Sequence, residues 1–138
     1  MLTRTQNYAA AVFEQMEPLA QRNQAYRDKY KSMAEKLPVL IRTAGLAQAL
    51  AFVEAKAVKE QAWGDLLDHL ACTVGHTNRS SLSAASRSPR STLGAYTRLT
   101  SQTLEALLWY KRFAQSLLDA EPEPGSQRAL PEDGGASR

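Results

Sequence analysis

Several features that many proteins have are missing from this chain of 138 residues. It has one cysteine, Cys72, so no internal disulfide can form, as expected in a reducing cytoplasm. Lys, Arg, Gln or Glu interrupts every hydrophobic stretch, so none reaches the ~18–20 residues that a membrane helix needs. The first residues also lack the apolar core of a secretory signal. We therefore expect a cytoplasmic protein that does not span a membrane.

Acidic side chains are missing from a long internal stretch. Between Asp68 and Glu105 the charged side chains, histidines aside, are Arg79, Arg87, Arg90 and Arg98. The net charge of the whole chain is only +3 because residues 121–138 contribute an acidic excess, and residues 1–120 are correspondingly more basic. A moderately basic body suits a polyanionic partner, although it is also common in proteins that bind no nucleic acid.

Hydrophobic residues recur at helical intervals through most of the chain, and no segment shows the alternation of a strand. The spacing predicts a first helix over residues 5–22. A second helix begins after Asn23, a residue type that caps helices, and contains Pro38, where we expect either a kink or a restart. Gly45 then ends this helix with a left-handed backbone. The third and fourth helices are lined by Leu46, Leu50, Val53 and Ala57, and by Trp63, Leu66, Leu67, Leu70 and Val74.

The helical pattern stops over residues 75–91, where a run of serines and Pro89 predict a long, mobile Ser/Arg-rich loop. It returns in a last helix, whose coiled-coil-like seam is Tyr96, Leu99, Thr103, Ala106, Tyr110, Phe113 and Leu117. Apolar residues also lie off this seam, namely Leu104, Leu107, Leu108 and Trp109, so the helix is either central in the bundle or its second face contacts another chain. Residues 121–138 are rich in Pro, Gly and Glu and predict a disordered tail. Residues 1–120 are expected to form one all-α domain, a single bundle of five or six helices.

No arrangement in the sequence is typical of an active site. His69, Cys72 and His76 are spaced so that one helix face could carry three zinc ligands. Gly75 would end that helix near His76, however, and no second Cys or His cluster completes a site, so solvated histidines and a small core cysteine are the favoured interpretation. Gly45 alone cannot build a phosphate-binding loop. We expect no enzyme activity, no metal and no cofactor.

Basic residues form a more informative pattern. Arg22, Lys29 and Lys36 recur every seven residues and would form a row of one sign along the second helix, with steps of about 10 Å. Such a row can follow a phosphate backbone, or it can be three solvated side chains on a bundle surface. A second candidate patch, Lys111 with Arg112, lies among aromatic residues in the last helix. A third is a flexible basic arm in the predicted loop, formed by Arg79, Arg87 and Arg90.

Three stretches, by their order and spacing, carry a resemblance to a known family. The stretches are residues 26–36, 36–56 and 96–118. Within the second, residues 37–52 read Leu-Pro-Val-Leu-Ile-Arg-Thr-Ala-Gly-Leu-Ala-Gln-Ala-Leu-Ala-Phe. Over residues 4–118 the chain resembles the small α-helical subunit of the type III-B CRISPR (Cmr) RNA-targeting effector complex.

This resemblance implies a non-catalytic subunit of a ribonucleoprotein for antiviral defence. Copies of such a subunit stack as a filament and line the groove where guide RNA and target RNA pair. The implied partners are the guide RNA/target RNA duplex, the other Cmr subunits including the backbone subunit, and further copies of the chain. The basic positions within matching segments become RNA-facing or interface candidates, namely Lys36, Arg42, Lys56, Lys111 and Arg112. The charge pattern itself adds Arg22, Lys29 and Arg98.

A different class of function is the alternative. The chain could be a helical protein-interaction adaptor without a nucleic-acid role, in which the second hydrophobic face of the last helix binds a partner protein. Replacement of Arg22, Lys29 and Lys36 by Glu separates the two hypotheses. An RNA subunit should keep its fold but lose target binding in the assembled complex, whereas the function of an adaptor should not change.

Overall fold

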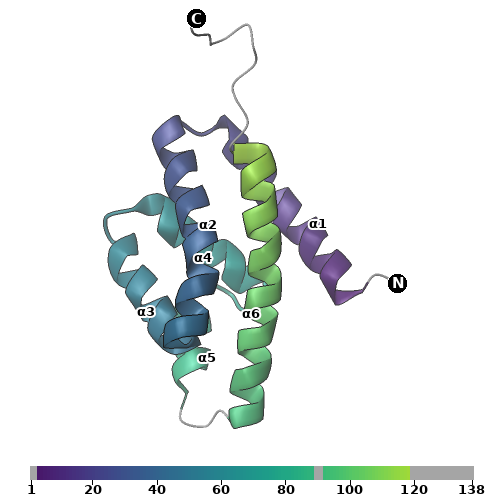
Figure 1. Ribbon diagram of the computed structural model, residues 1–138, viewed down its shortest axis with the longest axis vertical. Coiled ribbons are helices and arrows are strands. Elements are labelled where there is room, and N and C mark those ends of the chain that lie inside the picture. The colour runs from purple at the N-terminus through teal and green to yellow at the C-terminus, as the bar shows by residue number, and fades with distance from the viewer. Residues whose placement is uncertain (1–2, 89–91, 119–138) are drawn as a thin grey trace, which may run out of the picture.

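The computed structural model describes residues 3–88 and 92–118, and these residues form helices and no strand. The elements are α1 (Arg4–Met16), the 3-10 helix η1 (Glu17–Gln21), α2 (Gln24–Ala44), α3 (Leu46–Ala57), α4 (Gln61–Thr73), α5 (Arg79–Arg87), α6 (Leu93–Phe113) and the π-helical turn η2 (Ala114–Leu118). In Figure 1, α2 and α6 lie side by side, α1 crosses beside α6, and α3 lies on the other side of α2. The predicted all-α fold is confirmed. Within the described part of the chain, no helix combines the length and the hydrophobicity that crossing a bilayer requires.

The first helix ends earlier than predicted. Thr3 and Gln6 form a capping box at its start, in which the Thr3 hydroxyl accepts from the Gln6 backbone N–H (3.1 Å) and the Gln6 side chain accepts from the Thr3 backbone N–H (2.9 Å). Pro18, at the beginning of η1, has no backbone N–H with which to continue the α-helical ladder. α1 therefore ends at Met16, and the 3-10 helix leads the chain toward α2.

The second helix and its two ends follow the sequence pattern closely. The Asn23 side chain accepts a hydrogen bond from the Tyr26 backbone N–H (2.8 Å), which confirms the predicted cap. Pro38 is buried inside α2, and the helix continues through it to Ala44 without a restart. Gly45 has φ +90° and ψ 158°, a region that is open essentially only to glycine, and its backbone N–H still bonds the Ile41 carbonyl (2.9 Å). One residue thus ends α2 and begins α3.

The long loop predicted over residues 75–91 is wrong in its central part, because residues 79–87 form helix α5. Asn78 caps this helix and makes a reciprocal capping box with Ser81. Leu82, the one bulky hydrophobic residue of the segment, is fully buried. A single well-placed Leu and a good cap are therefore enough to dock this short helix against α3 and α4.

The serines of α5 are compatible with a buried helix because their hydroxyl groups find partners. Ser83, which is 2% exposed, donates to the Glu54 carboxylate on α3 (2.8 Å), and Ser86 donates to the Ser83 carbonyl (2.7 Å). Short side chains also let α5 approach its neighbours closely. The predicted tail, residues 121–138, lies outside the described residues.

Helix α6 buries the middle of its predicted seam within the bundle, whereas its second apolar face is buried only in part, so contact of that face with another chain stays a prediction. The helix packs against α1, α2 and α4. Thr103, Ala106 and Tyr110 of the predicted seam are buried, and Leu107 on the second face is buried as well. Leu108 differs, because 43% of its surface is exposed. Leu104 and Trp109 are half-buried, so the second apolar face of α6 is covered only in part within the chain itself.

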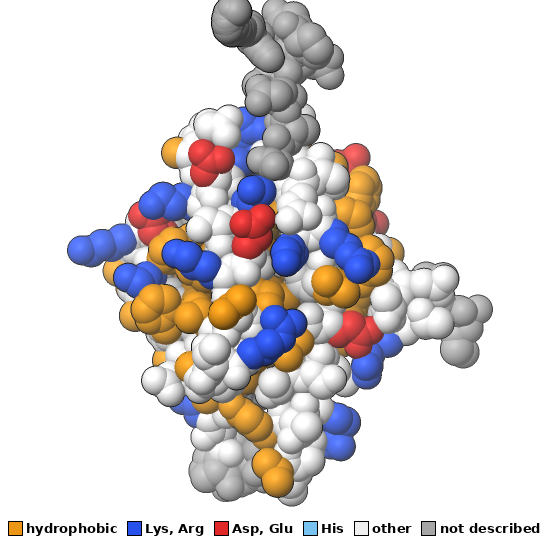
Figure 2. Space-filling model, in the orientation of Figure 1, with side chains coloured by type: hydrophobic (Ala, Val, Ile, Leu, Met, Phe, Trp, Pro, Cys, Tyr) orange, Lys and Arg blue, Asp and Glu red, His pale blue; other side chains and the backbone are white. Residues whose placement is uncertain are grey.

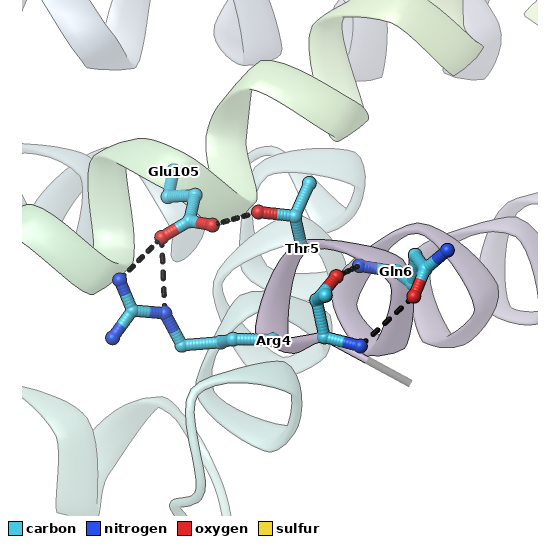
Figure 3. A network of polar contacts seen from close by, with 5 residues as sticks. Arg4, Thr5, Gln6 and Glu105 are labelled. Atoms are coloured by element: carbon cyan, nitrogen blue, oxygen red, sulfur yellow. Dashed lines mark hydrogen bonds and ion pairs between the residues drawn. The ribbon is translucent and has the colours of Figure 1, made fainter. Parts of the chain in front are cut away.

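A polar contact fixes the start of α1 to the middle of α6 (Figure 3). The guanidinium of Arg4 donates to one oxygen of the Glu105 carboxylate from Nε (3.0 Å) and Nη2 (2.7 Å), and the Thr5 hydroxyl donates to the other oxygen. The Thr5 hydrogen bond lowers the pKa of Glu105, burial opposes this effect, and the hydrogen bond and charge of Arg4 lower the pKa further, so the net shift is downward. This carboxylate is therefore held in its charged form where the two helices meet.

Two further polar contacts lie inside the bundle, between α4 and its neighbours. The Tyr110 hydroxyl of α6 contacts both the Gln15 side chain of α1 and the Thr73 hydroxyl of α4. The Tyr30 hydroxyl of α2 contacts Nδ1 of His69 on α4 (2.8 Å), and burial lowers the pKa of this histidine. Because these buried groups satisfy one another, they fix the register of four helices without leaving their own polar atoms unpaired.

Candidate nucleic-acid interface

The three candidate zinc ligands do not converge. α4 ends at Thr73, and Gly75 turns the chain with φ +96°, so His76 lies beyond the helix. His69 faces Tyr30 in the bundle, whereas the exposed Cys72 lies toward the Thr77 carbonyl (3.5 Å). Across residues 3–88 and 92–118, no group of three His, Cys, Asp or Glu side chains is placed to hold a metal ion.

The predicted basic row along α2 is only partly a row on one helix. Arg22 precedes the helix, which starts at Gln24, and its guanidinium stacks 3.8 Å from the centre of the Tyr26 ring. Lys29 is on the helix, forms an ion pair with Glu60 (3.5 Å) and lies 5.9 Å from the ring of Trp63. The N-terminal end of the predicted row therefore belongs to a surface built from the start of α2 and the start of α4.

Lys56 joins this surface from α3. Its ammonium group lies 5.1 Å from the ring of Phe52, one helical turn earlier on the same helix. A hollow of about 470 Å³ opens between the end of α3 and the start of α4. The residues that line it are Phe52, Ala55, Lys56, Lys59, Glu60 and Trp63. Three predicted cations, Arg22, Lys29 and Lys56, thus lie at one corner of the bundle, each beside an aromatic ring.

Arg42 and Lys111 lie at a second place, the groove between α2 and α6. This small groove is lined by Glu35, Pro38, Val39, Arg42, Leu104, Leu108 and Lys111. Val39 is 56% exposed, so the groove combines uncovered apolar surface with two cations. Figure 2 shows the face over α2 and α6, on which Lys and Arg side chains are interspersed with hydrophobic ones.

The aromatic residues of the last helix are less free than the sequence suggested. Trp109 is stacked on Phe113, with ring centres 5.7 Å apart, and Phe113 meets Phe13 of α1 edge to face. The Arg112 guanidinium lies 5.1 Å from the Trp109 ring. Arg112 therefore borders an aromatic cluster between α1 and α6, whereas its neighbour Lys111 belongs to the groove on the α2 side.

The remaining arginines fall elsewhere. Arg98 is exposed near the start of α6 and belongs to neither surface. The flexible basic arm is wrong for Arg79 and Arg87, which are part of α5, and Arg90 lies outside the described residues. Arg79 is structural, because its backbone N–H donates to Asp68 (2.9 Å) and its guanidinium occupies the space beside Gly64.

Most of the candidate cations keep their charge available for a partner. Lys29 is in an ion pair, but the other seven form none with any carboxylate in residues 3–88 and 92–118. These seven are Arg22, Lys36, Arg42, Lys56, Arg98, Lys111 and Arg112. The structure places Arg22, Lys29 and Lys56 at the corner and Arg42 and Lys111 at the groove. The other three candidates, Lys36, Arg98 and Arg112, line neither, so the eight residues do not form one site.

Two residues of the corner were missed by sequence reasoning. Phe52 is 45% exposed and Lys59 is exposed, and both line the larger hollow. Their spacing with Lys56 was the available signal, because residues 52, 56 and 59 recur at the three- and four-residue steps of one helix face. The many apolar neighbours of Phe52 in the sequence hide this signal, since they make the whole helix look uniformly hydrophobic.

Comparison with known proteins identifies the family. The family model described as CRISPR-associated protein (Cas_Cmr5) matches residues 4–117. The chain belongs to the Cmr5 family. A curated relative from Thermus thermophilus, "CRISPR system Cmr subunit Cmr5", is 40% identical over 119 residues, which cover 86% of this chain and 99% of that protein.

The fold agrees with that assignment. The crystal structure of a Cmr5 family protein from Thermus thermophilus superposes with a TM-score of 0.77 at 41% identity, over 85% of this chain and 98% of the other. The Cmr5 match extends from the first residue of α1 almost to the end of η2. The resemblance drawn from residues 4–118 is therefore confirmed for the part of the chain in which all the candidate cations lie.

Proposed function

We propose that this chain is a non-catalytic structural subunit of a Cmr (type III-B CRISPR) ribonucleoprotein, in which its basic surfaces line the groove that holds guide RNA and target RNA. The proposal rests on membership of the Cmr5 family, since a relative bears the name of a Cmr subunit. The observation that carries the RNA-facing role is the set of seven exposed or half-exposed candidate cations without a carboxylate partner in the described residues. Such cations release counterions when they meet phosphates.

The two surfaces suit different partners. The corner of Arg22, Lys29 and Lys56 is rich in charge, and we assign it to RNA. The α2–α6 groove exposes Val39 and Leu108 next to cations, and we assign it to a neighbouring subunit of the complex. Exposed apolar residues rimmed by polar ones are typical of a protein contact.

The test is a pull-down of the complex from co-expressed Cmr subunits, with this chain tagged. One variant replaces Arg22, Lys36 and Lys56 by Glu, and a second replaces Val39 and Leu108 by Ser. The first variant should enter the complex but weaken target RNA binding, and the slope of its salt dependence should fall by about one for each cation that no longer meets a phosphate. The second should lower incorporation of the subunit.

The control is Arg87→Glu on α5, which reverses one exposed charge away from both surfaces. A chain that does not join the other Cmr subunits contradicts the proposal. Normal target binding by the triple Glu variant contradicts the RNA-facing role and favours the adaptor function. Both the RNA-facing subunit and the adaptor would be incorporated less well when Val39 and Leu108 are replaced. The measurement of target RNA binding therefore decides between these two functions.

A further inference from the structure

The corner between α3 and α4 offers more than positive charge. Its hollow of about 470 Å³ is within the range of about 300–1,000 Å³ that is usual for sites that bind small molecules. Two aromatic rings, Phe52 and Trp63, form its apolar part, and Lys56 and Lys59 form its basic part. A binding surface of this composition can recognise a flat ring and an anion at the same time.

A second hollow of about 220 Å³ adjoins the first, and Glu60 lines both. It adds Arg22, Tyr26 and Lys29 to the surface. Glu60 is the one acidic residue among those that line the two hollows, and it is already paired with Lys29. The surface as a whole therefore keeps a positive excess that attracts an anion.

One of the two aromatic rings, that of Trp63, is held in place before any ligand arrives. Trp63 donates its indole N–H to the backbone carbonyl of Lys29 (3.0 Å), which fixes the ring against α2. Phe52 is 45% exposed, so a large part of its ring is open to solvent. A preorganised ring binds a flat ligand without first losing rotamer freedom.

Single-stranded nucleic acid is the ligand class that uses both halves of this surface. Each unpaired base offers a π-face to an aromatic side chain, and the adjoining phosphate pairs with a cation. A duplex keeps its bases stacked inside, so it would leave Phe52 and Trp63 unused. An acidic peptide would use the lysines alone.

We propose that the α3–α4 corner is a subsite for an unpaired nucleotide of single-stranded RNA, whose base stacks on Phe52 and Trp63 and whose phosphate binds Lys56 and Lys59. The subsite rests on the proposed RNA-facing function but goes further, because it assigns the corner to an unpaired nucleotide and the guide–target duplex to other cations. Lys36, which lies outside both hollows, is available for the duplex.

The experiment measures binding of the full chain to fluorescein-labelled 12-nucleotide probes by fluorescence anisotropy in 50 mM salt. The probes are a single strand, the matching duplex, and an abasic strand that keeps every phosphate but has no bases. The wild-type chain should bind the single strand at least fivefold more tightly than the abasic strand, the lower end of what one stacked base contributes. It should also prefer the single strand to the duplex.

Two variants separate stacking from charge. Phe52→Ser should weaken binding of the single strand toward the level of the abasic strand, with Trp63 keeping the rest of the difference, and leave abasic binding unchanged. Lys56→Gln with Lys59→Gln should weaken both probes and lower the salt slope by one to two. Leu93→Ser and Arg87→Gln are the matched controls, one apolar and one basic, at exposed positions outside the corner. Far-UV circular dichroism shows whether each variant is folded.

A second measurement does not depend on Phe52. In a Trp109→Phe variant, Trp63 is the one remaining tryptophan, and its fluorescence should be quenched by the single strand but not by the abasic strand. Equal affinity for single and abasic strands, tighter binding of the duplex, or no binding of any probe would each overturn the subsite. If the subsite fails while the triple Glu variant still disrupts target binding in the assembled complex, the proposed function stands without it.

Discussion

Leu82→Ala is the sharpest test of the bundle, because it acts on the helix that replaces the expected loop. Leu82 is fully buried and is the one large hydrophobic residue of α5, a helix of nine residues. Because a helix of this length has little stability of its own, the docking of α5 depends on the Leu82 side chain. Buried Leu→Ala changes cost about 2.7–5 kcal/mol, and we expect about 3 kcal/mol here. In a domain of this size that corresponds to a fall in melting temperature of roughly 10–15 °C.

The assay is urea unfolding followed by circular dichroism at 222 nm, with two controls at Ala84, an exposed position of the same helix. Ala84→Ser should change the free energy of unfolding by no more than about 0.5 kcal/mol. Ala84→Gly should cost about 0.5–1 kcal/mol if the backbone is helical there, and nothing if it is a loop. A loss below about 1 kcal/mol for Leu82→Ala, together with a neutral Ala84→Gly, would show that α5 is not a packed helix.

Three further predictions concern stability. Glu105→Gln should lower the free energy of unfolding by about 1 kcal/mol at low salt and less in 1 M salt, since the contact with Arg4 is partly exposed; a loss that salt does not reduce would contradict an ionic origin. The half-buried His69 has a lowered pKa, so its contribution to stability should be complete above its unfolded pKa near 6.5 and should fall as the pH drops through the lower folded pKa. The urea midpoints of the wild-type chain at pH 7.5 and pH 5.5 should therefore differ more than those of His69→Asn. Gly45→Ala should cost about 1–3 kcal/mol because of its positive φ. Gly94→Ala, in the first turn of α6, where a Cβ would make only ordinary contacts at 4.0 Å, should be neutral or slightly stabilising in the same urea unfolding assay.

The long helices could be predicted because each has a clear period of apolar residues. The Asn23 cap, the break at Gly45 and the buried lining of α3 and α4 all lie where the spacing placed them. The end of α1 was missed although Pro18 signalled it, since the apolar stripe continues into η1 with the buried Leu19. Hydrophobic periodicity does not distinguish an α-helix from a 3-10 helix that follows it.

Helix α5 was missed for a different reason. Its serines lower the local hydrophobicity, and their satisfaction depends on contacts with α3 that the sequence cannot show. The capping box of Asn78 and Ser81 was visible and would have been the correct signal. A polar segment can therefore be helical when its neighbours supply hydrogen-bond partners for short side chains.

The candidate site was predictable in residue type but not in arrangement. The family and the basic residues could be read from the chain, yet a period of seven placed Arg22 on a helix that begins two residues later. The pairing of Lys29 with Trp63, and the hollow between α3 and α4, depend on how three helices pack. Such contacts between elements carry no signal in the local spacing of one sequence.

The junction of α1 with α6 has a consequence for how the chain is made. Arg4 meets Glu105 across almost the whole length of the bundle sequence, and Phe13 meets Phe113. Contacts of such large sequence separation form only after the intervening chain is available, and their loop-closure cost slows folding. During synthesis the ribosome must release α6 before α1 can dock against it, so the part of the apolar stripe of α1 that α6, rather than α4, covers stays open while most of the protein is translated. Early termination within α6 would leave that part uncovered, which makes truncated products natural targets for chaperones and proteases.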